Sequence, residues 1–106
     1  MPTKNDYLNI GFKLFLEHKY QQAIEQFNKA IDLDPQFDLA FNALAETYNK
    51  LGELDKAIEM AKKLVEINTN DPLAHTALSR LYVQKGMIAE AEKEMAISNR
   101  LSSENS

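Results

Sequence analysis

The sequence predicts an all-α fold built from three copies of a helix hairpin, six antiparallel helices in total. Gly52 and Gly86 lie 34 residues apart, and each separates two runs in which apolar residues recur with the 3.6-residue period of a helix. The residues around the first glycine recur around the second at the same offset: Tyr48 with Tyr82, and Ala57 with Ala91. A fixed period of this length indicates a repeat architecture.

Three units of this length account for nearly the whole chain. We expect them to form a single domain, residues 1–106, with repeats at residues 4–37, 38–71 and 72–105. The segments "DLDPQFD" and "NTNDPLA" mark the ends of the first two units, because proline is tolerated in the first turn of a helix but not in its interior. The final residues, "SSENS", are predicted to be a disordered tail.

Each unit is expected to turn between its two helices at one residue. In the second and third units this residue is Gly52 or Gly86, because a residue without a Cβ atom adopts the left-handed conformation at little cost. In the first unit His18 takes the same position, and histidine is among the residues enriched at positive φ. The sequence therefore predicts three turns of one kind.

Composition limits the class of protein. The chain has 106 residues, 44% of them apolar, which suits one small domain with a core. It has no cysteine, so disulfides and thiolate chemistry are excluded, and we expect a cytoplasmic protein. The net charge of −4 comes from interleaved acidic and basic residues, with no basic stripe for nucleic acid and no apolar run long enough to insert in a membrane.

The repeated residues resemble the tetratricopeptide repeat (TPR) pattern of aromatic, Leu-Gly, Tyr, Ala, Phe, Ala and Pro. The first unit carries this pattern as Tyr7, Ile10-Gly11, Leu14, Ala23, Phe27, Ala30 and Pro35. The resemblance implies a right-handed α-solenoid in which the first helix of each pair lines a concave groove that holds a peptide or partner segment. Independently of the family, the small residues Gly11, Ala45 and Ser79 are expected to let the paired helices approach closely.

The sequence gives no sign of catalysis. His18 and His75 lie in different units without a completed set of metal ligands, so we expect structural roles for both and no metal or cofactor. Phosphate-binding loops, nucleophile elbows and HExxH motifs are absent. Acidic residues such as Glu94 are interpreted as solvated helix faces or charges in the first turn of a helix, rather than as an acid/base pair.

A second apolar stripe on the first helix is the main candidate for a binding surface. At 100° per residue, Tyr7, Ile10 and Leu14 form the predicted core stripe. The second stripe lies roughly 150° away and is expected to face the groove. The predicted groove residues are Leu8, Phe12, Phe15 and Leu16 in the first unit, Asn42, Glu46 and Asn49 in the second, and Arg80 and Val83 in the third.

Two hypotheses of function follow from this stripe. The first is an adaptor that binds a peptide or partner segment; the second is a structural protein that self-assembles through the first helix or its C-terminal surface. A third interpretation, without function, is that Phe15 and Leu16 only cover the end of the core.

One type of partner is not expected. TPR domains that bind the acidic tails of heat-shock chaperones use lysine, asparagine and arginine side chains. The residues at the matching positions here cannot bind a carboxylate: Leu8, Phe12, Ala43, Leu73 and Ala77.

Overall fold

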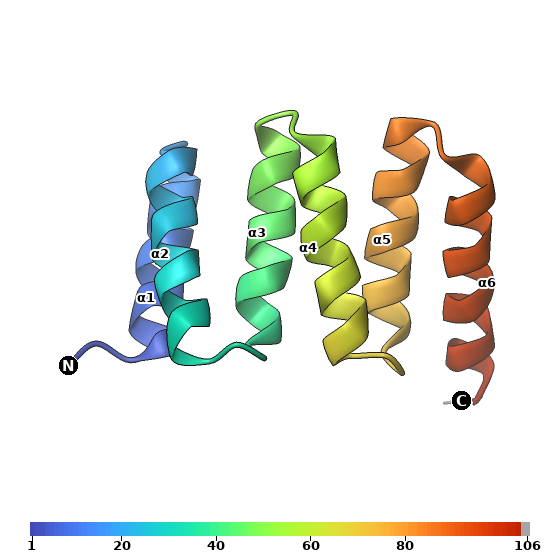
Figure 1. Ribbon diagram of the computed structural model, residues 1–106, viewed down its shortest axis with the longest axis horizontal. Coiled ribbons are helices and arrows are strands. Elements are labelled where there is room, and N and C mark those ends of the chain that lie inside the picture. The colour runs from blue at the N-terminus through green and yellow to red at the C-terminus, as the bar shows by residue number, and fades with distance from the viewer. Residues whose placement is uncertain (105–106) are drawn as a thin grey trace.

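The computed structural model describes residues 1–104, and within them it contains six α-helices and no strand. The helices are α1 (Lys4–Leu16), α2 (Tyr20–Leu33), α3 (Asp38–Lys50), α4 (Leu54–Ile67), α5 (Pro72–Lys85) and α6 (Ile88–Glu104). They form three antiparallel hairpins in a row along the 41 Å long axis, with the N-terminus at one end and the last hairpin at the other (Figure 1). The predicted all-α helical-hairpin solenoid is therefore confirmed.

The turns within the hairpins have the geometry expected from the sequence. His18, Gly52 and Gly86 have φ angles of 62°, 77° and 87°, all in the left-handed region. In each turn the following residue donates a backbone hydrogen bond to the carbonyl five residues earlier. These bonds are Lys19 to Leu14 (2.9 Å), Glu53 to Tyr48 (2.9 Å) and Met87 to Tyr82 (2.8 Å). This hydrogen bond is typical of a Schellman motif at the end of a helix. The first helix of all three hairpins therefore ends in the same way.

Small residues allow the paired helices to pack closely, as predicted. A Cβ atom built on Gly11 of α1 would lie 2.3 Å from Cε1 of Phe27 on α2, so only glycine fits against this ring. Phe27 is fully buried, and its ring meets that of Phe12 edge to face at 5.5 Å. In the third hairpin the hydroxyl of Ser79 donates to the carbonyl of Ala91 at 2.7 Å, which satisfies the buried polar group.

A side-chain bond joins the start of the first helix to the residue after the second helix in two of the hairpins. In the first hairpin Lys4 Nζ donates to Asp34 Oδ2 at 2.6 Å. In the second, Asn68 Nδ2 donates to Asp38 Oδ2 at 2.9 Å. The two pairs occupy equivalent positions 34 residues apart, but the donor and the acceptor have exchanged places. Each bond therefore links the beginning of one hairpin to its end.

The bond from Lys4 makes the stability of the first hairpin dependent on pH. The Lys4 ammonium, and then the backbone N–H of Gln36, hold the pKa of Asp34 below its ordinary value of 3.8. A carboxyl whose pKa is lowered on folding stabilises the protein above its unfolded pKa and loses this effect as the pH falls through the folded pKa. We therefore expect Asp34→Asn to destabilise the protein near neutral pH, and the difference from the wild type to shrink as the pH falls below about 4.

Urea unfolding at a series of pH values tests this expectation. Asp32→Asn is the matched control, because Asp32 is exposed and has no ion-pair partner among residues 1–104. A stability difference for Asp34→Asn that stays constant down to about pH 2 would contradict the assignment.

Two expectations about the third hairpin are wrong. Ser102 to Glu104 belong to the last turn of α6, so this part of "SSENS" is helical; Asn105 and Ser106, which include the end of the predicted third repeat, lie outside the described residues. Glu94 does not lie on a solvated face, because its Oε1 is 2.9 Å from Nδ1 of the buried His75. Nε2 of the same ring is 2.7 Å from the carbonyl oxygen of Thr69, which gives His75 a structural role linking α5, α6 and the loop before α5.

Candidate functional site

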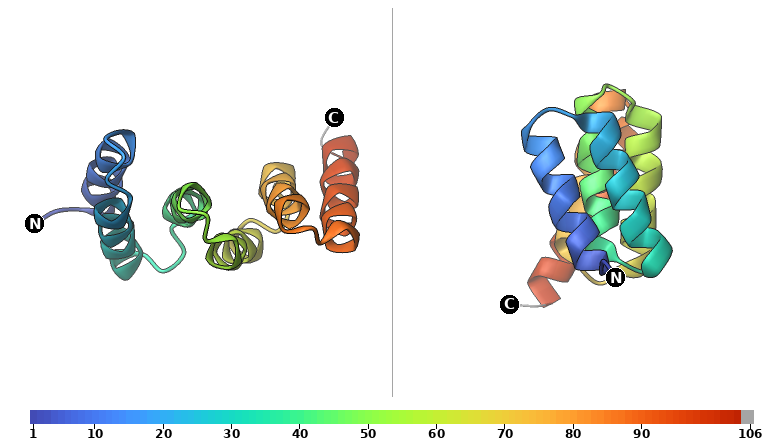
Figure 2. Two further views of the ribbon diagram at one scale, coloured as in Figure 1. Left: turned by 90° about the horizontal axis from the view of Figure 1, so that it is seen from above. Right: turned by 90° about the vertical axis from the view of Figure 1, so that its left-hand side faces the viewer.

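A groove runs between α3 and α5, with α4 as its floor. α4 packs against both of these helices and lies to one side of them when the molecule is seen from above (Figure 2, left). Two hollows lie along the groove, and Asn42 of α3 lines both of them. The groove therefore continues from the first turns of α3 and α5 to their last turns.

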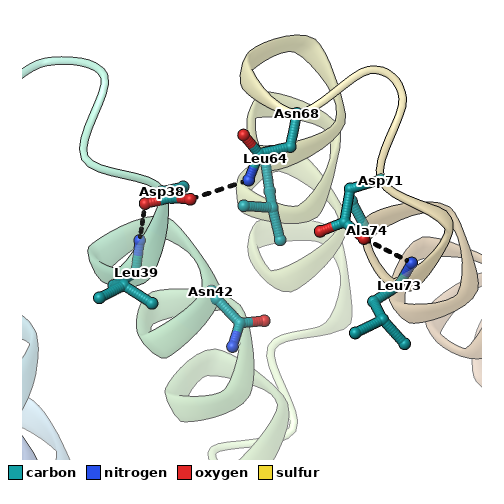
Figure 3. A pocket seen from close by; sticks show the side chains of 8 residues that line it. All are labelled: Asp38, Leu39, Asn42, Leu64, Asn68, Asp71, Leu73 and Ala74. Atoms are coloured by element: carbon teal, nitrogen blue, oxygen red, sulfur yellow. Dashed lines mark hydrogen bonds between the residues drawn. The ribbon is translucent and has the colours of Figure 1, made fainter.

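The amino-terminal hollow, at the first turns of α3 and α5, is about 240 Å³ in volume. It is lined by Asp38, Leu39, Asn42, Leu64, Asn68, Asp71, Leu73 and Ala74 (Figure 3). Leu64 from α4 and Ala74 from α5 are buried, whereas Leu39 and Leu73 on the facing helices are 53% and 75% exposed. The hollow thus has apolar walls that are open to solvent.

Hydrogen bonds fix the polar edge of this hollow. Asp71 is the N-cap of α5, and its Oδ1 accepts the backbone N–H of Leu73 at 3.0 Å. Asp38 accepts the N–H of Leu39 at 2.9 Å through Oδ1 and the side-chain amide of Asn68 through Oδ2. Asp71 is therefore held at the start of α5 as its N-cap, and Asp38 is held in the first turn of α3 by its bonds to Leu39 and Asn68.

The central hollow is about 180 Å³ in volume, and five of its eight lining residues carry charged or amide side chains. It is lined by Asn42, Ala45, Glu46, Asn49, Ala77, Arg80, Leu81 and Gln84. Within residues 1–104, none of its charged or amide side chains has a hydrogen-bond or ion-pair partner. Glu46 and Arg80 in particular form no ion pair with one another. These groups are available to a ligand.

The structure brings four of the predicted groove residues together. Asn42, Glu46, Asn49 and Arg80 line the central hollow from its two facing helices. Val83 is 55% exposed on α5 but does not line either hollow.

The predicted residues of α1 lie apart from this groove. Phe12 packs on Phe27, and Phe15 meets the ring of Tyr20 at 5.4 Å, so both rings partly cover the core of the first hairpin. Leu16 is 77% exposed at the end of the helix. None of the three lines the groove between α3 and α5.

The predicted division of α1 into two stripes is wrong at two residues. Leu8, expected in the groove, is only 5% exposed and belongs to the core, whereas Ile10, expected in the core, is 46% exposed. α1 contacts α3 as well as α2. Its buried face is therefore centred on Leu8 and Gly11, between these two neighbours.

The amino-terminal hollow was not predicted from the sequence. Leu39, Leu73 and Asp71 sit at or beside the first residues of their helices, where a periodic pattern is shortest and the helix boundary least certain. One signal was present: Leu39 and Leu73 are 34 residues apart, so two apolar side chains recur at one position of the repeat.

Comparison with known proteins identifies the class of fold and then the family. The fold and groove define a helix-hairpin repeat protein, and a family model described as tetratricopeptide repeat matches residues 14–81 and 52–98. The chain belongs to the tetratricopeptide repeat family. Among solved structures, a crystal structure of MamA superimposes with a TM-score of 0.91 and 27% identity, over 97% of this chain and 60% of that one.

Curated relatives are longer than this chain. The BBSome complex member BBS4 of Bos taurus is 32% identical over 83 residues, which cover 78% of this chain and 16% of that protein. An Hsp70-Hsp90 organising protein of Plasmodium falciparum is 28% identical over 87 residues, covering 82% of this chain and 32% of the relative. The chain thus corresponds to less than a third of either protein.

The fold is also shared with a peptide-bound structure. The second TPR of Spaghetti (RPAP3) bound to HSP90 peptide SRMEEVD has a TM-score of 0.83 and 20% identity, over 93% of this chain and 92% of that one. Within residues 1–104, no helix is both long and apolar enough to span a membrane.

Proposed function

We propose that this protein is a non-catalytic interaction module whose groove between α3 and α5 binds an extended segment of a partner protein. The observation that carries the proposal is the central hollow, where two facing helices present side chains without partners in the described chain. An extended segment offers unpaired backbone N–H and C=O groups. The amides of Asn42 and Asn49 can each donate to one such group and accept from another.

The size of the hollows favours a peptide over a small molecule. Their volumes, about 240 and 180 Å³, are below the roughly 300–1,000 Å³ of typical small-molecule sites. They suit single side chains of a segment that passes from one hollow to the next. The Spaghetti TPR, bound to its HSP90 peptide, supports a peptide as the class of ligand for this fold.

Moderate affinity is expected. Association costs roughly 4–15 kcal/mol, and hydrogen bonds to neutral groups contribute only about 0.5–1.5 kcal/mol each. A dissociation constant in the micromolar range corresponds to about −8 kcal/mol, so the segment has to gain roughly 12–23 kcal/mol from contacts along the whole groove to reach it, and tighter binding is not expected.

The test uses peptides selected from a random twelve-residue display library on the wild-type protein. Asn42→Ala combined with Arg80→Ala is expected to weaken their binding at least about tenfold, because two hydrogen-bonding groups of the groove are lost. Glu59→Ala combined with Lys62→Ala on the exposed side of α4 is the matched control and should bind normally. Equal binding by the two double variants, measured by fluorescence anisotropy, would contradict the proposal.

Self-assembly is the second candidate, favoured by the exposed side chains of Phe12 and Leu16 on α1. Sedimentation at a series of concentrations distinguishes it from the adaptor. A dimer that Leu16→Asp disperses would support assembly; a monomer at all concentrations would support the adaptor. Leu16 is the better probe, since Phe12 also packs on Phe27.

We do not propose an acidic chaperone tail as the ligand. Of the positions that would have to bind its carboxylates, Leu8 and Ala43 are buried, and Leu73 and Ala77 contribute apolar surface to the two hollows.

A further inference from the structure

We propose that the partner segment carries a lysine or arginine whose side chain occupies the amino-terminal hollow. This inference rests on the proposed function, since it names the chemistry of the segment that the groove binds. Two observations support it: this hollow combines apolar walls with a negatively charged edge, and the groove as a whole has a negative net charge.

The walls of the hollow suit an aliphatic stem. Leu39, Leu64 and Leu73 approach it from three different helices, and two of these leucines are more than half exposed. Covering them with CH₂ groups removes apolar surface from water. Lysine and arginine have such stems, and they characteristically bury the stem while the charged head stays at the polar edge.

The edge of the hollow suits a cationic head. Asp38 and Asp71 stand at the ends of α3 and α5, and no lysine or arginine lines the hollow. Asp71 uses Oδ1 for Leu73, and its other oxygen accepts no hydrogen bond within residues 1–104. Figure 3 shows this oxygen directed toward the space between α3 and α5. An ammonium or guanidinium group would supply the missing donor.

Other kinds of side chain fit less well. An acidic residue would face two carboxylates of the same sign. A purely aliphatic residue would cover the leucines but would partly dehydrate Asp71 without giving it a partner. Along both hollows the lining includes three carboxylates and one guanidinium, a net charge of −2, so the groove as a whole favours a basic segment.

The spacing of the hollows predicts where the basic residue lies in the segment. Glu46 follows Leu39 by seven residues, and Arg80 follows Leu73 by seven, which corresponds to about 10.5 Å along a helix. An extended chain rises roughly 3.3 Å per residue. The residue that meets Glu46 and Arg80 is therefore about three positions away from the basic one.

The experiment uses the peptides selected on the wild-type protein, each synthesised also with norleucine replacing its lysine or arginine. Norleucine keeps an aliphatic stem and removes the charge. Asp71→Asn is the diagnostic variant, because asparagine is as good an N-cap as aspartate and α5 should remain intact. Glu59→Gln on α4 is the control with the same change of charge outside the groove.

We expect the selected peptides to share a basic residue, and Asp71→Asn to weaken their binding about three- to tenfold. The norleucine analogues should bind more weakly to the wild type and show no difference between wild type and Asp71→Asn. Glu59→Gln should leave all affinities nearly unchanged.

Two results would overturn the inference: selected peptides that lack a basic residue, or norleucine analogues that bind as tightly as their parent peptides. The proposed function would remain intact in either case if binding is still weakened by the Asn42→Ala and Arg80→Ala double substitution. Peptide binding that is insensitive to that double substitution would instead overturn the proposed function itself.

Discussion

Replacing Phe27 by alanine is expected to lower the free energy of unfolding by about 3–5 kcal/mol. Phe27 is fully buried in the core cluster of the first two hairpins, against Gly11 and the ring of Phe12. Truncation removes these contacts and leaves a cavity that the tightly packed helices cannot fill. Urea denaturation followed by circular dichroism measures the change.

Leu16→Ala provides the control for this experiment. It removes a large apolar side chain from the adjoining helix, but one that is 77% exposed, so we expect a change within about 0.5 kcal/mol. A cost below about 1 kcal/mol for Phe27→Ala would show that the interface of α1 and α2 is looser than the structure describes.

Gly11→Ala is expected to destabilise the protein by about 1–3 kcal/mol, although alanine is the better helix former by roughly 1 kcal/mol. The added Cβ atom would lie 2.3 Å from Cε1 and 2.9 Å from Cζ of Phe27. These atoms belong to a fully buried ring, so relief requires α1 and α2 to move apart. Thermal unfolding should therefore show a lower midpoint.

A second substitution tests whether the ring causes this loss. Phe27→Ala removes Cδ1, Cε1 and Cζ, the three atoms that the added Cβ atom would meet, so in a double-mutant cycle Gly11→Ala should cost less in the Phe27→Ala background than in the wild type. The second hairpin shows the same compensation in natural form, since it has Ala45 and Ala61 where the first has Gly11 and Phe27. Additive effects of the two substitutions would exclude the clash as the cause.

The features that sequence predicted correctly are set by local chemistry. A left-handed turn requires glycine or one of few other residues, so Gly52, Gly86 and His18 marked the three turns. The repeat then related one hairpin to the next, which predicted that Asn42 and Arg80 lie on facing helices.

The features that were predicted wrongly from the sequence depend on how neighbouring helices pack together. The two predicted stripes on α1 were both apolar, and the face that became buried, centred on Leu8 and Gly11, was decided by contacts with α2 and α3 together. Periodicity along one helix therefore could not separate Leu8 from Ile10. Glu94 resembled other surface carboxylates, and only the packing of α6 on α5 brought it to His75.

The reversed side-chain bonds at the hairpin ends have a consequence for how such chains can be recombined. Lys4 with Asp34, and Asp38 with Asn68, each lie inside one repeat. Exchanging or duplicating whole repeats keeps both bonds. A hybrid hairpin that joins the first helix of the second repeat to the second helix of the first repeat would instead place Asp38 opposite Asp34, two like charges. Intact hairpins are therefore the natural units for shuffling or for building longer chimaeric arrays.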